Sequence, residues 1–277
     1  MTLRADRLRV RVGAATLLDA ITLAARPGEV LALIGPSGAG KTTLLRAWSG
    51  ELRPTAGAVT LAGVPLAAID PRALARARAV LPQQASLRFP LTALEVVLLG
   101  RLPHPSRGES AADLAIAGEA LALAEADHLA ERLASTLSGG EQQRVQLARA
   151  FAQIWEPTPA QAQRVLLLDE PTASLDPGHA ARILGRVRRF ARATRAAVVV
   201  AIHDLNAGAR CADRLALLDG GRVVAHGRPA AVLTPARLGR CFGAAFDLFT
   251  AADGGFAVHP RLLADETDET YEPWKTP

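Results

Sequence analysis

A glycine-rich loop placed between an apolar strand and a helix constrains the fold of this chain more than any other segment. The loop reads GPSGAGKTT, from Gly35 to Thr43. It follows the apolar run from Val30 to Ile34, and the residues from Thr43 to Ser49 have helical spacing. Glycines let successive backbone N–H groups curl around phosphate oxygens, and the N-terminus of the following helix adds partial positive charge. The segment therefore predicts a strand, loop and helix that bind nucleotide phosphates.

Two side chains of this loop have specific expected roles. Lys41 is one of only two lysines in the chain, and a compact ammonium fits among loop amides where a planar guanidinium would not. We expect Lys41 to reach the β and γ phosphates of a nucleoside triphosphate and Thr42 to be a Mg²⁺ ligand. The expected nucleotide-binding residues are Gly35, Pro36, Ser37, Gly38, Ala39, Gly40, Lys41, Thr42 and Thr43.

A second apolar run ends in two acidic residues. The segment VLLLDE extends from Val165 to Glu170. At such a strand end Asp169 is expected to hold Mg²⁺ through water, and Glu170 to act as the general base that polarises the water attacking the γ-phosphate. Two buried carboxylates without a metal would repel each other. The pair therefore predicts Mg²⁺ as cofactor and hydrolysis of a nucleoside triphosphate as the reaction.

The order of apolar runs and helical patterns predicts the fold class. Strands are expected at Ala79 to Leu81, Val165 to Leu168 and Ala197 to Ile202, with a helix from Gly178 to Thr194 between the last two. This βαβ alternation is typical of a parallel sheet. Shorter alternating runs come before residue 26 and after Pro54. We predict an α/β P-loop NTPase of the RecA-like type, with a mostly parallel sheet core, an N-terminal antiparallel β subdomain and an inserted α-helical subdomain.

Changes in composition predict the domain limits. Residues 85–154 are rich in Ala, Leu and Glu with helical spacing and are expected to form the helical subdomain. The core is expected to comprise residues 1–84 and 155–250, which makes 1–250 one domain. Residues 251–277 form a C-terminal extension. Its tail, 264–277, has five acidic residues, two prolines and almost no apolar periodicity, so we expect it to be flexible.

Composition and charge exclude several classes of protein. A chain with 49% hydrophobic residues can bury a full core, which excludes disorder over most of its length. The longest wholly apolar run, Ala196 to Ile202, is far shorter than the ~20 residues that cross a bilayer. No secretory signal opens the sequence, so a cytoplasmic protein is expected. The net charge is +5, but the arginines are scattered through expected helices, and we expect no nucleic-acid partner.

The segment LSGGEQQR, Leu137 to Arg144, lies between the glycine loop and the acidic strand end. With those two motifs, the chain resembles the ATP-binding subunit of an ABC transporter. The resemblance implies that this signature turn, followed by a helix from Glu141 onward, caps the nucleotide held by the opposite subunit of a head-to-tail homodimer with two ATP molecules. It also implies an integral membrane permease dimer as partner and a peripheral position on the cytoplasmic face of the inner membrane. The signature residues are Ser138, Gly139, Gly140 and Glu141.

Further roles follow from the same resemblance. Gln83, after the strand ending at Leu81, matches a glutamine that senses Mg²⁺ and γ-phosphate and is a catalytic and metal-binding candidate; its neighbour Gln84 is the alternative. His203 matches the switch histidine that contacts the γ-phosphate. Asp176 belongs to the family's interface loop between the two sites.

The first strands depart from the family pattern. Members usually stack adenine on an aromatic residue there, but no aromatic residue occurs from Leu8 to Leu17, and Val10 lies about where it would fall. Adenine is therefore expected to rest on aliphatic surface, with weaker discrimination between bases.

In detail the chain resembles ATPases of importers for iron chelates, vitamin B12 and especially heme. The segment from Leu81 to Arg101 is close to the hemin-importer version, and the connection between Phe151 and Val165 is longer than usual, as in the hemin subgroup. Heme is the cargo that this resemblance implies, delivered indirectly by a periplasmic heme-binding protein. A ferric siderophore or cobalamin is the alternative cargo. A soluble ABC ATPase acting on nucleic acid or the ribosome is the alternative from another class.

Overall fold

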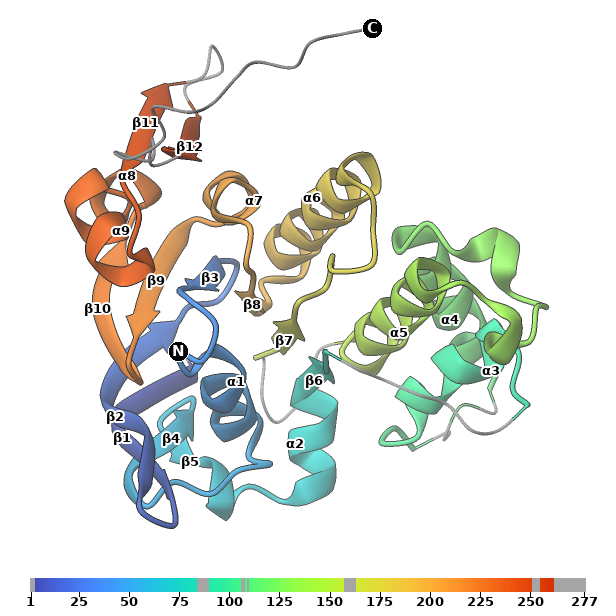
Figure 1. Cartoon of the computed structure of the whole chain (residues 1–277). Helices are drawn as coiled ribbons and strands as arrows, with labels where there is room; N and C mark the ends of the chain where they lie inside the picture. Colours follow the sequence, from blue (N-terminus) through green and yellow to red (C-terminus); the bar gives the residue numbers. More distant parts are fainter. Residues whose placement is uncertain are drawn as a thin grey trace, which may run out of the picture.

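A six-stranded sheet forms the centre of the computed structural model, which describes residues 3–83, 90–105, 108, 110–156, 163–250 and 255–261 (Figure 1). Its strand order is β10-β9-β3-β8-β7-β6, and all neighbours are parallel except the β9–β10 hairpin. The strands are β3 (Val30–Ile34), β6 (Arg78–Leu81), β7 (Val165–Asp169), β8 (Ala197–Ala201), β9 (Arg214–Asp219) and β10 (Arg222–Gly227). Every residue of β3, β7 and β8 is buried, because helices or a second sheet cover both faces.

The parallel register brings several strand ends to one edge of this sheet. Ala201 pairs with Leu33 on one side and with Asp169 on the other, so β3, β8 and β7 end close together. The loops that leave these strands therefore begin side by side, which is where ligands bind in open α/β sheets.

An antiparallel sheet at the N-terminus covers one face of the central sheet. Its order is β2-β1-β4-β5, and its apolar side packs with helix α1 and the central strands in one buried cluster that includes Trp48. Helix α1 lies directly after the glycine loop. The elements of this part are β1 (Leu3–Val12), β2 (Ala15–Ala25), α1 (Lys41–Ser49), β4 (Ala56–Leu61), β5 (Val64–Pro65), the short helix η1 (Leu66–Ala68) and α2 (Pro71–Ala77).

Three helices form a group at one side of the molecule, and two others cover the remaining face of the central sheet (Figure 1). In the first group, α3, α4 and α5 each begin with a capping box, in which the N-cap side chain and the carboxylate three residues later accept from two of the otherwise free N–H groups. A buried ion pair between Arg101 and Asp113 joins this group internally at 2.7 Å. The elements are α3 (Ala93–Leu98), η2 (Leu99–Arg101), α4 (Ala111–Leu123), η3 (Asp127–Leu129), η4 (Ala134–Thr136), α5 (Gly139–Gln153), and the covering helices α6 (Pro177–Thr194) and α7 (Leu205–Cys211).

The C-terminal elements pack against α7. Strand β11 (Phe246–Thr250) pairs with β12 (Phe256–Pro260), and the amide of Asn206 on α7 bonds both backbone groups of Val258. This hairpin pairs the end of the predicted domain, residues 1–250, with residues of the predicted C-terminal extension, 251–277. The predicted flexible tail, 264–277, lies outside the described residues. The remaining helices are α8 (Pro229–Val232) and α9 (Pro235–Phe242).

The predicted fold class is confirmed: a P-loop α/β core carries an N-terminal antiparallel sheet and an inserted group of helices. Some limits differ. Helix α1 begins at Lys41 rather than Thr43, because Gly40 takes the left-handed N-cap conformation. Helix α5 begins at Gly139 rather than Glu141, because the Ser138 side chain accepts a hydrogen bond from the Glu141 N–H and fixes the first turn. Within the described ranges, no helix has the length and hydropathy needed to span a membrane.

Candidate active site

A pocket of about 520 Å³ opens at the carboxyl edge of the central sheet. It brings together residues that the sequence separates by almost the length of the chain. The predicted residues that line it are Ser37, Gly38, Ala39, Gly40, Lys41, Thr42, Thr43, Gln83, Glu170 and His203; Thr16, Leu17, Gly220 and Gly221 complete the lining. Gln84 lies outside the described residues, so the structure does not compare it with Gln83.

The glycine loop is tightly fixed by its own backbone and by Lys41. Gly35 has φ +146°, and a Cβ built there would lie 2.1 Å from the Leu218 carbonyl oxygen. Only glycine, which has no Cβ, fits at this position. The Lys41 ammonium donates to the carbonyl oxygens of Gly35 at 2.7 Å and Pro36 at 2.9 Å. Gly35 and Pro36 thus support the loop instead of lining the pocket.

Lys41 is only 6% exposed, and this burial lowers its pKa. The nearby carboxylates of Glu170 and Asp169 act in the opposite direction and favour the charged amine. A cation enclosed by backbone carbonyls at the base of a pocket is suited to exchange those partners for phosphate oxygens.

Thr42, which lines the pocket, contacts Asp169 at the end of β7. The Thr42 hydroxyl donates to Asp169 Oδ1 at 3.2 Å, and Asp169 is 5% exposed. Burial raises the pKa of Asp169, while the hydrogen bond from Thr42 lowers it. A hydroxyl and a buried carboxylate are hard oxygen donors, and Mg²⁺ typically takes one or two protein oxygens with water and phosphate completing its shell. The two residues therefore fit the predicted metal.

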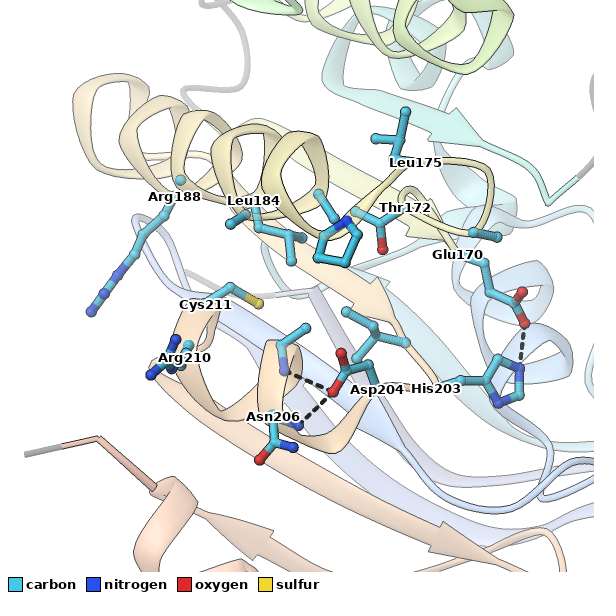
Figure 2. Close-up of a pocket in the computed structure, with 17 residues that line it drawn as sticks. Glu170, Thr172, Leu175, Leu184, Arg188, His203, Asp204, Asn206, Arg210 and Cys211 are labelled. Carbon is cyan, nitrogen blue, oxygen red and sulfur yellow. Dashed lines mark hydrogen bonds and ion pairs between the residues drawn. The ribbon is translucent and has the colours of Figure 1, made fainter. Parts of the chain in front are cut away.

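Glu170 and His203 face each other from the ends of adjacent strands. Glu170 Oε1 lies 2.5 Å from His203 Nε2, at one end of a second cavity of about 510 Å³ beside α6 and α7 (Figure 2). Asp204, the next residue, caps α7 by accepting from the backbone N–H groups of Asn206 and Ala207. The cap fixes where the chain turns after β8, and so fixes the position of His203.

The backbone of Glu170 is in the left-handed region, with φ +51°. For a residue with a side chain this conformation costs about 1–3 kcal/mol and persists only where surrounding bonds hold it. The Glu170 N–H donates to the Ala201 carbonyl oxygen at 3.0 Å, and its own carbonyl oxygen accepts from Gln143 Nε2 at 2.7 Å. The candidate base is thus held by strand β8 on one side and helix α5 on the other.

The signature turn belongs to a different pocket, of about 460 Å³. None of its described lining residues lines the phosphate-loop pocket, so the signature turn and the phosphate loop of one chain belong to separate pockets. Ser138 caps α5, and the Glu141 carboxylate accepts from the Ser138 N–H at 2.8 Å and from Arg132 at 3.2 Å. The lining residues are Ser138, Gly139, Gly140, Glu141, Arg144, Ser174, Leu175, Asp176 and His179.

Asp176 caps helix α6 in this second pocket. The backbone N–H of His179 donates to its carboxylate at 3.0 Å, and the His179 ring also contacts it. These bonds lower the pKa of Asp176 to about 2. Asp176 is therefore ionised and oriented at the loop where the sequence placed an interface contact.

The expected position of the adenine surface needs correction. Val10 is 1% exposed and belongs to the buried cluster under the N-terminal sheet, so it cannot meet a base. Leu17, which is 37% exposed, lines the phosphate pocket instead, as does Thr16. Beside the phosphate loop the exposed positions are therefore on β2 and not on β1.

The sheet, the loop with Lys41 and the acidic strand end together define a P-loop nucleotide-binding protein. The family model for ABC transporters matches residues 18–173. The chain belongs to the ABC transporter family, whose ATPases bind ATP.

Individual relatives agree with this assignment. The chain is 53% identical to a hemin import ATP-binding protein of Gloeobacter violaceus, over 87% of each sequence. It is 52% identical to a protein of the same description from Myxococcus xanthus, over 88% of this chain and 90% of that one. The resemblance to the hemin group is thereby confirmed.

Solved structures show the same architecture. One belongs to an inward-facing ABC transporter described as being of metal-chelate type, with a TM-score of 0.78 and 25% identity over 95% of this chain and 98% of that one. Another is the dimeric structure of a bacterial ABC transporter cassette, with a TM-score of 0.70 and 28% identity over 82% of this chain and 98% of that one.

Proposed function

We propose that this chain is the ATP-hydrolysing subunit of an importer that moves heme across a membrane. The observation that carries the ATPase part is the single pocket in which Lys41, Thr42, Gln83, Glu170 and His203 come together. Sequence relatives at 53% and 52% identity, described as hemin import ATP-binding proteins, support the cargo.

The geometry supports a division of work among these side chains. Lys41 exchanges its bonds to loop carbonyls for bonds to the β and γ phosphates. Thr42, Gln83 and, through water, Asp169 would hold Mg²⁺, which when bound would neutralise charge at the phosphates. Glu170 accepts a proton from the attacking water, and His203 orients the Glu170 carboxylate and contacts the γ-phosphate.

The two separate pockets of one chain support a head-to-tail homodimer. In this arrangement Ser138, Gly139 and Gly140 of one subunit lie over the nucleotide held by the phosphate loop of the other, and Asp176 lies at the interface. The start of α5 provides free N–H groups and partial positive charge for the phosphates. A cassette of similar fold is described as dimeric, which supports the same assembly here.

The remaining partners are proposed from the same relatives. A permease dimer would carry the membrane path, with this subunit bound peripherally at the cytoplasmic face of the inner membrane. A periplasmic heme-binding protein would act on the permease, and so only indirectly on this chain. The likeness to a transporter of metal-chelate type keeps ferric siderophore as an alternative, together with cobalamin.

Reconstituted transport tests this proposal. The chain is assembled with its permease in vesicles, and uptake of labelled heme is measured with and without ATP, using Glu170→Gln as the matched inactive control. ATP-dependent heme uptake that excess cobalamin or ferric siderophore does not reduce supports the proposal. Uptake of either competitor in place of heme would overturn the cargo. Co-purification with RNA or DNA and no permease would overturn the transport function.

A further inference from the structure

The side chain of Gln143 connects the signature helix to the candidate general base within one chain. Gln143 lies in α5, three residues after Gly140. Its Nε2 donates to the Glu170 carbonyl oxygen at 2.7 Å, and its Oε1 accepts from the Ser174 N–H at 3.2 Å. One amide therefore bonds both ends of the loop that leads from the base to the interface segment.

The position of these bonds matters because of the backbone they hold. Glu170 has φ +51°, so its backbone orientation depends on the bonds around it. The Glu170 N–H donates to Ala201 on strand β8, and the Glu170 carbonyl oxygen accepts from Gln143 Nε2 at 2.7 Å and, more weakly, from the Ala173 N–H at 3.3 Å. Rotation of that peptide would move the carboxylate relative to His203, 2.5 Å away.

The same loop is also in close contact with the signature turn. A Cβ at Gly140 would lie 2.9 Å from the Ser174 carbonyl oxygen, and one at Gly139 would lie 3.8 Å from the Ser174 Cβ. A side chain added at Gly140 would therefore overlap Ser174, and one added at Gly139 would touch it. A shift of α5 is therefore transmitted to the loop by contact and to Glu170 by the amide of Gln143.

We propose that Gln143 is a positioning residue that sets the orientation of Glu170 and couples it to the signature turn. When the signature turn engages a nucleotide held by the second subunit, the start of α5 becomes fixed, and Gln143 fixes the base. Hydrolysis then depends on the partner's nucleotide contact. The inference rests on the proposed ATPase function and adds a residue to that site.

Two substitutions separate the contacts of this amide. Gln143→Met keeps the length of the side chain and removes donor and acceptor together. Gln143→Glu keeps an acceptor for the Ser174 N–H and removes the donor to the Glu170 carbonyl oxygen. For both variants of the full chain we expect kcat for ATP hydrolysis to fall about 10²-fold, as misplacement of a reacting group by about 1 Å can cause. The KM for ATP should stay within about twofold, because neither change touches the phosphate loop.

Gln153→Met is the matched control. Gln153 lies on the same helix, and its amide also bridges two backbone carbonyl oxygens, those of Ala75 and Arg78. In the described part of the chain its side chain bonds neither Glu170 nor Ser174. This variant should lose thermal stability and keep its kcat. Binding of a fluorescent ATP analogue to each variant shows that the fold and the phosphate loop are intact.

Four outcomes are distinguishable. A lowered kcat with unchanged KM for both Gln143 variants, and not for the control, supports the coupling. Full activity of Gln143→Glu would overturn it, since the contact with Glu170 would then be dispensable. An equal loss of kcat in the control would also overturn it, because any α5-to-core amide would then have the same effect. A wild-type chain that hydrolyses no ATP would overturn the proposed function itself.

Discussion

Replacing Gly35 by alanine tests the claim that this loop position admits only glycine. The added Cβ would lie 2.1 Å from the Leu218 carbonyl oxygen, a backbone atom that no rotamer change can move, and φ is +146°. Gly38→Ala is the matched control within the same loop. Gly38 has φ +78°, but a Cβ there would meet nothing within 4 Å. The two variants therefore share a left-handed backbone position and differ in crowding.

The two sites predict different losses of stability. For Gly38→Ala the only cost is that of holding alanine in a left-handed backbone conformation, about 1–2 kcal/mol. For Gly35→Ala the forced backbone shift adds an overpacking cost of about 1–3 kcal/mol or more. In a domain of this size 1 kcal/mol lowers Tm by roughly 2–4 °C. We expect a decrease of about 2–8 °C for Gly38→Ala and a decrease about twice as large for Gly35→Ala.

Thermal unfolding of the nucleotide-free chain, followed by far-UV circular dichroism, measures the Tm decrease of each variant. Without nucleotide, the difference in Tm reflects strain within the loop and not a loss of contacts with phosphate. Equal Tm values for the two variants would refute the reasoning, because the close approach of Gly35 to β9 would then have no effect on stability.

Three further predictions concern the two pockets. Glu170→Gln should lower the rate of phosphate release about 10²- to 10⁴-fold while ATP binding is retained, because an amide can still hydrogen-bond to His203; unchanged turnover would remove Glu170 from its role as base. Hydrogen bonds from the backbone N–H and the ring of His179 lower the pKa of Asp176 from 3.8 to about 2. The ionised carboxylate therefore stabilises the folded chain fully above pH 3.8, and this stabilisation is lost as the pH falls from 3.8 to about 2. The Tm of Asp176→Asn should decline less steeply than that of the wild type over this interval, and parallel declines would contradict the cap. Leu17→Tyr should tighten ATP binding about tenfold without changing the affinity for inorganic triphosphate, because stacking on a base contributes roughly 1–3 kcal/mol; an equal change for both ligands would place the base elsewhere.

The phosphate loop, Asp169 and Glu170 could be placed from the sequence because their geometry is local. A buried strand that ends at a defined residue puts the next residues at the edge of the sheet, whatever the rest of the chain does. The parallel arrangement then brings Glu170 and His203 together, since adjacent strands end at the same edge. The positions needed only strand limits and the order of the motifs, whereas the role of His203 was implied by the resemblance to the ABC family.

Leu17 could not be found in the same way. The pairing of β1 with β2 has register shifts between Leu8 and Val10 and between Val10 and Arg11. A shift of one residue reverses which side chains face the core, so alternation along these strands does not show which face Val10 or Leu17 takes. The wrong choice of Val10 follows from that ambiguity.

The contact between Gln143 and Glu170 was missed for a different reason. It joins a side chain on a helix to a backbone oxygen 27 residues later, and its existence depends on how α5 packs against the loop that follows β7. The sequence showed a helix after the signature turn but not which of its polar residues faces the sheet. Packing of this kind is a tertiary property that no local pattern specifies.

The presence of two non-overlapping partial sites on one chain has a genetic consequence. One mutant can be damaged at Lys41 and another at Gly139, so that each is inactive alone. If cassettes pair head to tail, a mixed dimer combines the intact loop of one mutant with the intact turn of the other, and one of its two sites is whole again. Coexpressed defective alleles should therefore complement each other, whereas two alleles damaged in the same half should not.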